Sequence, residues 1–240
     1  MDGQNNFTRC IMKKLICCCL LCLLTYTAQS QALIALVFGG KITNTRLRVG
    51  IYLGASGSWI TEGDGQVPRY GLAIGAYTNY RLQEKWDLVL NIVMKQPKGA
   101  NEMNYDNKLI APLDSNLIGT DIDRRVTYLD VMPMIRYNIT PSWGIAFGPQ
   151  LAARTTAKDT YKKDDENGTL SYQVKTKDYI KRIDVGLSFD VQYTLMKGHG
   201  MRLNATYNLG LMNFYKDNAG LTGKHQQILV GVGIPIGKTK

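Results

Sequence analysis

The stretch of sequence that decides the fold spans residues 183–195 and reads IDVGLSFDVQYTL. Apolar side chains occupy every second position, and polar side chains or glycine occupy the positions between them. Successive side chains of a β-strand point to opposite faces, so this alternation predicts a strand with one apolar and one polar face. The pattern begins near Tyr179 and exceeds the roughly 9–11 tilted residues with which a strand crosses a bilayer.

The same alternation recurs along the rest of the chain. It predicts eight strands, which cover residues 47–54, 70–80, 86–95, 125–139, 143–154, 179–195, 202–211 and 227–236. The composition agrees, because 45% hydrophobic residues are too many for a disordered chain and 24 glycines too many for a helical bundle. We therefore predict an all-β fold.

The connections between these strands alternate between long and short. The long ones cover residues 60–67, 96–124, 157–177 and 216–224, and the short ones cover 83–85, 140–142 and 197–200. In an up-and-down barrel, alternate connections share one rim, so one rim carries long loops and the other tight turns, as in outer-membrane barrels. The pattern predicts an eight-stranded antiparallel up-and-down transmembrane β-barrel, although soluble lipocalin-like barrels also have unequal ends.

Aromatic residues cluster at both ends of the predicted strands. Those beside short turns are Tyr80, Trp86, Tyr137, Trp143 and Tyr193, and those near the long loops are Trp59, Tyr70, Tyr128, Tyr179, Phe214 and Tyr215. Amphipathic rings concentrate at the two interfaces of a bilayer, so we expect two aromatic belts.

Residues 1–30 have the layout of a secretory signal peptide. Lys13 and Lys14 precede an apolar run over 15–24, and Ala28 and Ser30 supply a small-residue exit. All five cysteines lie in this segment, so cleavage after Ser30 leaves a cysteine-free barrel domain over residues 31–240. A short membrane anchor, a buried helix or a lipoprotein signal are the alternatives.

The chain is basic, with a formal charge of +10 that becomes +8 when residues 1–30 are removed. A basic balance often indicates nucleic acid or an anionic surface. An exported chain rarely meets nucleic acid, so we expect membrane lipid and lipopolysaccharide as neighbours, no nucleic acid, and a monomer in the cell outer membrane.

With the apolar face turned to lipid, charged side chains point into the barrel. They are Arg48, Asp87, Asp130, Arg136, Arg154, Arg182, Asp184, Asp190 and Arg202. The interior of an eight-stranded barrel is filled by side chains, so we expect arginines and aspartates to pair in a packed ionic core. A proton or ion path is the alternative.

The sequence offers little for catalysis. His199 lies in a short turn, and His225 opens the last strand, where Ser58, Asp64 or Asp217 could approach it in a lipid-modifying barrel enzyme. No motif favours that alternative, and neither a phosphate loop nor a zinc pattern occurs.

The acidic run over 164–167 lacks the alternating ligand spacing of a calcium loop, which favours a solvated loop tip over a calcium site. We therefore predict no catalytic, cofactor-binding or metal-binding residues, and no cofactor.

Two stretches carry a family resemblance. Residues 32–41 followed by 47–55, and the closing VGVG over 230–233, resemble PorT-type outer-membrane β-barrel proteins. The resemblance implies an eight-stranded barrel exported to the outer membrane, and some relatives are implicated in secretion of other proteins. The chain departs from many outer-membrane barrels because residues 234–240 contain no terminal aromatic residue.

The prediction is a non-enzymatic outer-membrane barrel that presents the long loops 96–124 and 157–177 for binding, envelope integrity or secretion support. A possible protein partner would dock on these loops. Two alternatives stay open: an enzyme that acts on outer-leaflet lipid through His225, and a soluble periplasmic lipocalin-like carrier with its apolar faces inward.

Overall fold

The computed structural model describes residues 46–62, 65–165, 168–198 and 200–236. The predicted signal peptide lies outside these residues, and so does the 32–41 part of the sequence that resembles PorT-type proteins. So do Asp64, His199 and part of the acidic run over 164–167. Among the described residues, no helix has the length and apolar character needed to cross a membrane.

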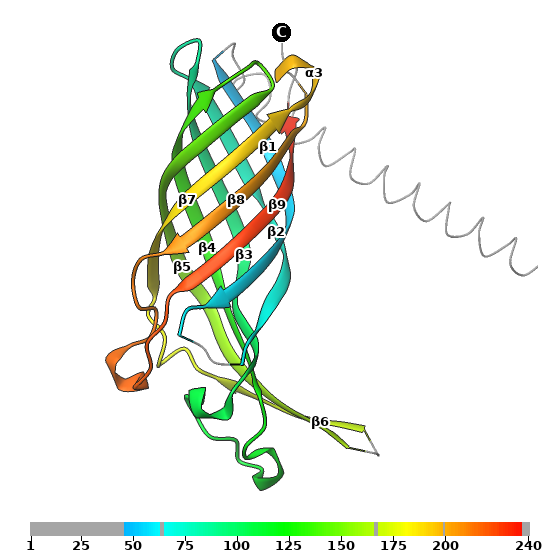
Figure 1. Ribbon diagram of the computed structural model, residues 1–240, viewed down its shortest axis with the longest axis vertical. Coiled ribbons are helices and arrows are strands. Elements are labelled where there is room, and N and C mark those ends of the chain that lie inside the picture. The colour runs from blue at the N-terminus through cyan, green and yellow to red at the C-terminus, as the bar shows by residue number, and fades with distance from the viewer. Residues whose placement is uncertain (1–45, 63–64, 166–167, 199, 237–240) are drawn as a thin grey trace, which may run out of the picture.

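Strands make up almost all of the regular structure (Figure 1). They are β1 Leu47–Ile60, β2 Val67–Arg81, β3 Trp86–Met103, β4 Ile122–Asn138, β5 Trp143–Asp165, β6 Gly168–Lys175, β7 Ile183–Thr194, β8 Arg202–Gly210 and β9 His225–Ile236. The short helical segments are η2 Tyr105–Asn107, η3 Ser115–Leu117, α3 Leu195–Gly198 and η4 Asp217–Ala219.

Eight of these strands close into a ring in which every pairing is antiparallel. Strand β1 pairs with β2 on one side and with β9 on the other, and the β4–β5 pairing completes the circle. Strand β6 pairs only with the end of β5 and forms a hairpin that projects from the long-loop rim (Figure 1). The predicted eight-stranded up-and-down barrel is confirmed, with β6 as an additional strand outside the ring.

The outer wall of the ring is apolar. Exposed side chains on it include Leu53, Leu72, Ile74, Leu88, Met94, Leu129, Ile135, Ile145, Phe147, Leu151, Ile183, Phe189, Val191, Leu203, Ile228 and Val230. The residues between them are buried and mostly polar, as Asn91, Gln150, Asn204 and Gln227 illustrate. A soluble carrier needs the opposite arrangement, so the lipocalin-like alternative is wrong.

Two lumen tyrosines explain the glycines of the first and last strands. A Cβ at Gly231 would lie 2.3 Å from the Tyr52 hydroxyl oxygen, and a Cβ at Gly50 would lie 2.4 Å from the Tyr77 ring. Both rings are buried, so each occupies space that only a glycine leaves open. The VGVG pattern in β9 therefore allows aromatic side chains to fill the lumen.

The aromatic belt at the short-turn rim forms as predicted. Trp86 packs on Tyr137 with ring centroids 4.9 Å apart, and Trp143 packs on Tyr193 at 4.8 Å. These pairs lie on neighbouring strands of the outer wall, where amphipathic rings meet the membrane interface.

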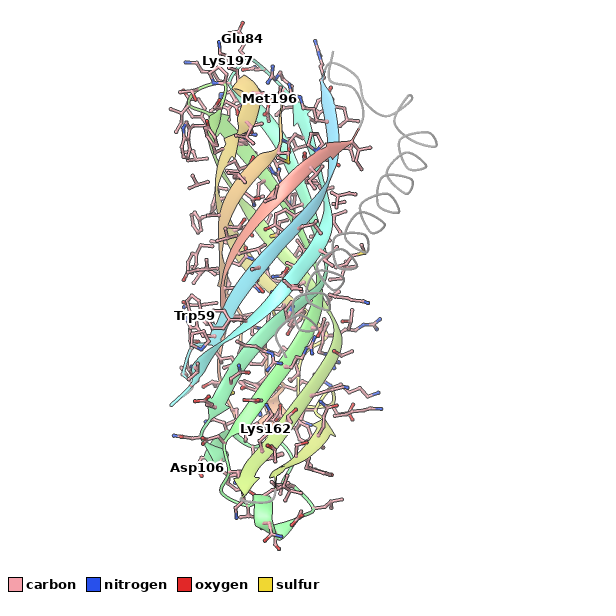
Figure 2. The ribbon with its side chains drawn as sticks, turned by 90° about the vertical axis from the view of Figure 1, so that its right-hand side faces the viewer. Trp59, Glu84, Asp106, Lys162, Met196 and Lys197 are labelled. Atoms are coloured by element: carbon pink, nitrogen blue, oxygen red, sulfur yellow. The ribbon has the colours of Figure 1, made fainter. Side chains whose placement is uncertain are left out.

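The belt at the long-loop rim differs from the prediction. Trp59 lies on the outer wall, between the short-turn end and the long-loop end of the molecule (Figure 2). Its Nε1 donates to Gln226 Oε1 at 3.1 Å, and the Tyr207 hydroxyl donates to the same oxygen at 2.9 Å. Tyr70 is also exposed, at 75%. The prediction was wrong for Tyr128, Phe214 and Tyr215, which are buried inside the protein instead.

A β-bulge changes which side chains of β3 face inward. Lys95 has a φ of 54°, and the register with β4 shifts between Val93 and Gln96. A bulge inserts one unpaired residue and reverses the alternation beyond it. Val93 points inward before the bulge, and Gln96 and Lys98 point inward after it.

A second β-bulge occurs in β5, where the register with β4 shifts between Thr127 and Tyr128. Gln150 and Ala152 face inward before the shift, and Asp159 and Tyr161 after it. The predicted loop 157–177 is therefore largely strand, because β5 and β6 continue through it with altered alternation. The predicted loop 96–124 is shorter than expected, because β3 continues to Met103 and β4 begins at Ile122, which leaves residues 104–121 as the loop.

The outer wall predicts the effect of a charge placed on it. Phe147 packs on Phe189 at a centroid distance of 4.8 Å, on the outer wall between the exposed Ile145 and Leu151. We expect Phe147→Lys to lower the free energy of unfolding by about 2–4 kcal/mol, measured by chemical unfolding from lipid vesicles, because lipid cannot solvate the ammonium group. Leu113→Lys, at a loop position that is 88% exposed, should change stability by less than about 0.5 kcal/mol. Equal effects at the two sites would show that Phe147 does not face lipid.

Candidate functional site

Most of the predicted lumen charges do lie inside the barrel. The buried ones are Asp87, Asp130, Arg136, Asp184, Asp190 and Arg202. Arg48 and Arg154 are half-buried, and Arg182 is exposed just before β7 begins, so its predicted place in the lumen was wrong. The charges separate into one group near the long-loop rim and another at the short-turn rim.

The group near the long-loop rim is centred on Lys98, a residue that the sequence analysis did not identify. Its Nζ lies 3.2 Å from Asp130 Oδ2 and 3.6 Å from Asp184 Oδ2. Asp130 also accepts a hydrogen bond of 2.6 Å from Gln150 Nε2, and Asp184 Oδ2 lies 3.1 Å from His225 Nδ1. We call Lys98, Asp130, Gln150, Asp184 and His225 the lumen cluster.

The lumen cluster is sealed from solvent by aromatic rings. Phe214 stacks on His225 with centroids 3.8 Å apart, and Tyr128 meets His225 edge-on at 5.5 Å. His225 is only 2% exposed. The His225 side chain therefore packs in the barrel interior between the two aromatic rings and Asp184.

The predicted partners of His225 are not its partners in the structure. The Ser58 hydroxyl donates to the backbone carbonyl oxygen of Gly99, at 3.1 Å. Asp217 begins η4 in the loop between β8 and β9, and Asp64 lies outside the described residues. The acid beside His225 is Asp184, so the triad proposed for a lipid-modifying enzyme does not form with Ser58.

The long loops are organised into a second feature, which we call the loop platform: residues 100–126, 157–165, 168–182 and 211–224. At its centre Arg124 makes a two-pronged ion pair with Asp159, with Nε–Oδ1 at 2.9 Å and Nη2–Oδ2 at 2.6 Å. Arg124 also donates to the Tyr215 hydroxyl and, at 2.8 Å, to the Asn107 carbonyl oxygen. This one side chain joins β4, β5, the 104–121 loop and the 211–224 segment.

Arg124 lies beyond the apolar band, on the part of β4 that extends past the membrane. Burial acts to lower its pKa, but the adjacent Asp159 carboxylate outweighs that effect and raises the pKa above its ordinary value. Burial likewise raises the pKa of the Tyr161 hydroxyl. Arg124 therefore keeps its charge and Tyr161 stays neutral at any physiological pH.

An apolar core packs around this ion pair. Its buried members include Ile60, Ala100, Met103, Leu117, Ile122, Val126, Tyr128, Ala157, Tyr161, Ile180, Phe214 and Tyr215. The 104–121 loop and the β5–β6 hairpin stand at the far end from the short turns, as the positions of Asp106 and Lys162 show (Figure 2). The long loops thus form a packed structure above the barrel.

The surface of the loop platform combines exposed apolar and basic side chains. Leu113 is 88% exposed and Ile118 is 60% exposed, both in the 104–121 loop. On the hairpin, Lys158 Nζ donates to Gln173 Oε1 at 2.9 Å, and Lys162 pairs with Asp123 at 2.6 Å. No group of three or more potential metal ligands occurs among the described residues.

A closed antiparallel ring with an apolar exterior and a charged interior defines a transmembrane β-barrel. The chain belongs to the family described as outer membrane protein beta-barrel domain, whose model matches residues 27–216. It is a β-barrel protein of the cell outer membrane.

The chain is also similar, at low sequence identity, to several solved structures of outer-membrane and surface proteins. Ail, the attachment invasion locus protein of Yersinia pestis, is 13% identical with a TM-score of 0.41, and the match covers 79% of this chain and 99% of Ail. OprG of Pseudomonas aeruginosa is 12% identical with a TM-score of 0.39, covering 80% and 95%. Neisserial surface protein A is 10% identical with a TM-score of 0.37, covering 79% and 96%. No curated protein matches the sequence.

The lumen cluster predicts a strong effect of removing its cation. Lys98→Met leaves Asp130 and Asp184 buried without Lys98 as counter-charge, and breaking a buried ion pair costs about 3–5 kcal/mol of stability. Unfolding titrations in detergent or vesicles would measure the loss. Lys98→Met combined with Asp130→Asn should recover part of it, and a single variant as stable as the parent would contradict the described ion pairs.

The burial of His225 predicts the outcome of testing it as a catalyst. Cells that carry His225→Gln should contain lipid A of the same mass as cells with the parent protein, because His225 is buried under Phe214. Mass spectrometry of extracted lipid A makes the comparison, with cells lacking the protein as reference. A lipid A species that disappears in both the variant and the deletion strain would establish the enzyme alternative.

Proposed function

We propose that the protein is a non-enzymatic scaffold of the outer membrane whose loop platform binds a protein partner outside the cell. The observation that carries the proposal is the buried Arg124–Asp159 pair, which fixes the long loops in one arrangement. A surface that is ordered before binding loses less conformational freedom when a partner docks.

The composition of the loop platform supports a protein partner. Leu113 and Ile118 expose apolar side chains on a loop far from the short-turn rim, where lipid does not cover them. Apolar side chains on a rigid loop commonly anchor protein interfaces. Their separation from the apolar band of the barrel distinguishes them from the lipid-facing residues.

Lipid and lipopolysaccharide are the proposed neighbours of the barrel wall. The exposed Lys95 and Arg182 stand just beyond the apolar band, where cations can meet the anionic groups of outer-leaflet lipid. We further propose that the protein is a monomer, and that residues 1–30 are the signal that exports it.

The resemblance to PorT-type barrels gives the proposed binding a biological setting. Some relatives of that type are implicated in secretion of other proteins, and a rigid extracellular platform suits docking of a secreted or surface protein. Envelope integrity is the other role that the scaffold proposal accommodates.

A photo-crosslinking amino acid at position 113 tests the proposal in intact cells. We expect it to form an adduct with one discrete protein, because Leu113 is exposed at the surface of the loop platform. The matched control carries the same probe at position 88, where the side chain is 44% exposed on the lipid face. That control should give no discrete protein adduct.

A second variant keeps the test specific. Ile118→Ser should reduce the adduct from position 113 while heat-modifiable gel migration shows an intact barrel. Absence of a protein adduct from position 113, in cells where the barrel is folded and at the surface, would refute the proposed function.

A further inference from the structure

The short-turn rim, which faces the periplasm in barrels of this kind, contains a small pocket with an unusual charge balance. The pocket has a volume of about 40 Å³, enough for about three water molecules. Five arginines line it, namely Arg46, Arg48, Arg81, Arg136 and Arg202, together with a single acidic residue, Asp87. The formal charge of this lining is therefore +4.

The one carboxylate does little to balance the buried arginines. The only ion pair of Asp87 joins its Oδ1 to Nε of Arg81, at 3.6 Å, among the described residues. The Arg81 side chain is 49% exposed, so this pair lies at the solvent edge and not beside the buried arginines. No described residue supplies a carboxylate within 4.0 Å of Arg136 or Arg202, so the arginine–aspartate pairing expected from the sequence was wrong at this end.

Arg136 and Arg202 are nevertheless deeply buried, at 4% and 1% exposed. Arg202 donates to the side-chain oxygens of Asn79 and Asn91, at 3.2 and 3.0 Å. Arg136 has one long contact of 3.5 Å to the Thr194 hydroxyl, and the Nε atoms of both arginines have no hydrogen-bond partner among the described residues.

Asp87 and the buried Asp190 act on these arginines only from beyond 4.0 Å. A buried guanidinium with no carboxylate at ion-pair distance is costly, since the cation has lost its water and gained little in return. An oxyanion in the pocket would supply both a close counter-charge and the missing acceptors. Guanidinium groups bind phosphate and carboxylate oxygens with two parallel hydrogen bonds. Five arginines line the pocket, and a phosphate group has the geometry to bind more than one guanidinium at once.

The other arginines are placed to admit such an anion. Arg48 is half-buried and donates to the Gly198 carbonyl oxygen in the turn between β7 and β8, and Arg81 reaches solvent. Arg202 is held over the Tyr77 ring, with its guanidinium carbon 4.0 Å from the ring centroid. The cations thus run from the solvent edge to the buried floor of the pocket.

We propose that this pocket is an anion-binding site that takes a phosphate group from the periplasmic side. The phosphate belongs either to a free small molecule or to a phospholipid headgroup at the inner leaflet. The site lies at the opposite end of the barrel from the loop platform and does not depend on the function proposed there.

Calorimetric titration of the folded full-length chain in uncharged detergent, at low ionic strength, tests the site. Inorganic phosphate should bind saturably with one site per chain, and acetate should bind more weakly. Arg136→Gln should weaken phosphate binding about tenfold or more, because it removes a charge-assisted hydrogen-bond donor. Arg125→Gln, an exposed arginine near the other rim, is the matched control and should bind like the parent.

Two further measurements exclude a folding defect and distinguish a free anion from a lipid headgroup. Arg81→Gln, at a side chain that is 49% exposed, should also weaken binding and guards against a folding defect in the Arg136 variant. A short-chain phosphatidylglycerol that binds more tightly than phosphate assigns the site to a lipid headgroup, and the reverse order assigns it to a free anion. No saturable binding of either, equal weakening by Arg125→Gln, or binding of an acidic peptide alone would overturn the proposal.

Discussion

Backbone hydrogen bonding in lipid is the constraint on which the rest of this structure depends. A strand that crosses a bilayer has no water for its amide groups, so each strand must be paired on both sides. The pairing of β1 with β9 and of β4 with β5 satisfies this requirement for all eight ring strands. A ring of this size leaves a narrow interior, which Tyr52, Tyr77 and the charged residues fill. The two proposed binding sites therefore lie at the two rims.

The sequence was sufficient to predict the barrel because lipid on one side and a polar lumen on the other impose a period of two. It was insufficient where bulges reverse that period. Beyond the bulge at Lys95, the side chains of β3 that point inward are the even-numbered ones instead of the odd-numbered ones. The alternation is broken there, so the sequence predicted a loop at Lys98 although this residue lies in the lumen. The extension of β5 through Asp165 was missed for the same reason, since its shift near Thr155 hides the continuing strand.

The sequence predicted which charged side chains point into the barrel better than it predicted which of them form pairs. Alternation predicted that Asp130, Arg136 and Asp184 point inward, which is confirmed. The sequence of each strand does not show how the strands are shifted along the barrel axis, so it does not predict which charged residues of different strands lie at the same height. Asp130 and Asp184 consequently share Lys98, and Arg136 lies at the other end of the barrel with no described carboxylate within 4.0 Å. The aromatic residues show the same limit, because Phe214 lies against His225 and not at the interface.

Hydrogen exchange of the backbone amides, measured residue by residue with the protein in lipid bilayers, tests the central claim of a closed ring most directly. The account predicts that β1 and β9 exchange as slowly as β4 and β5, because each strand is paired on both sides. The amides over residues 49–58 of β1 and 227–236 of β9 are the decisive ones, since they form the seam between the first and last strands. Fast exchange along that seam, with slow exchange elsewhere, would mean an open sheet and would contradict the barrel.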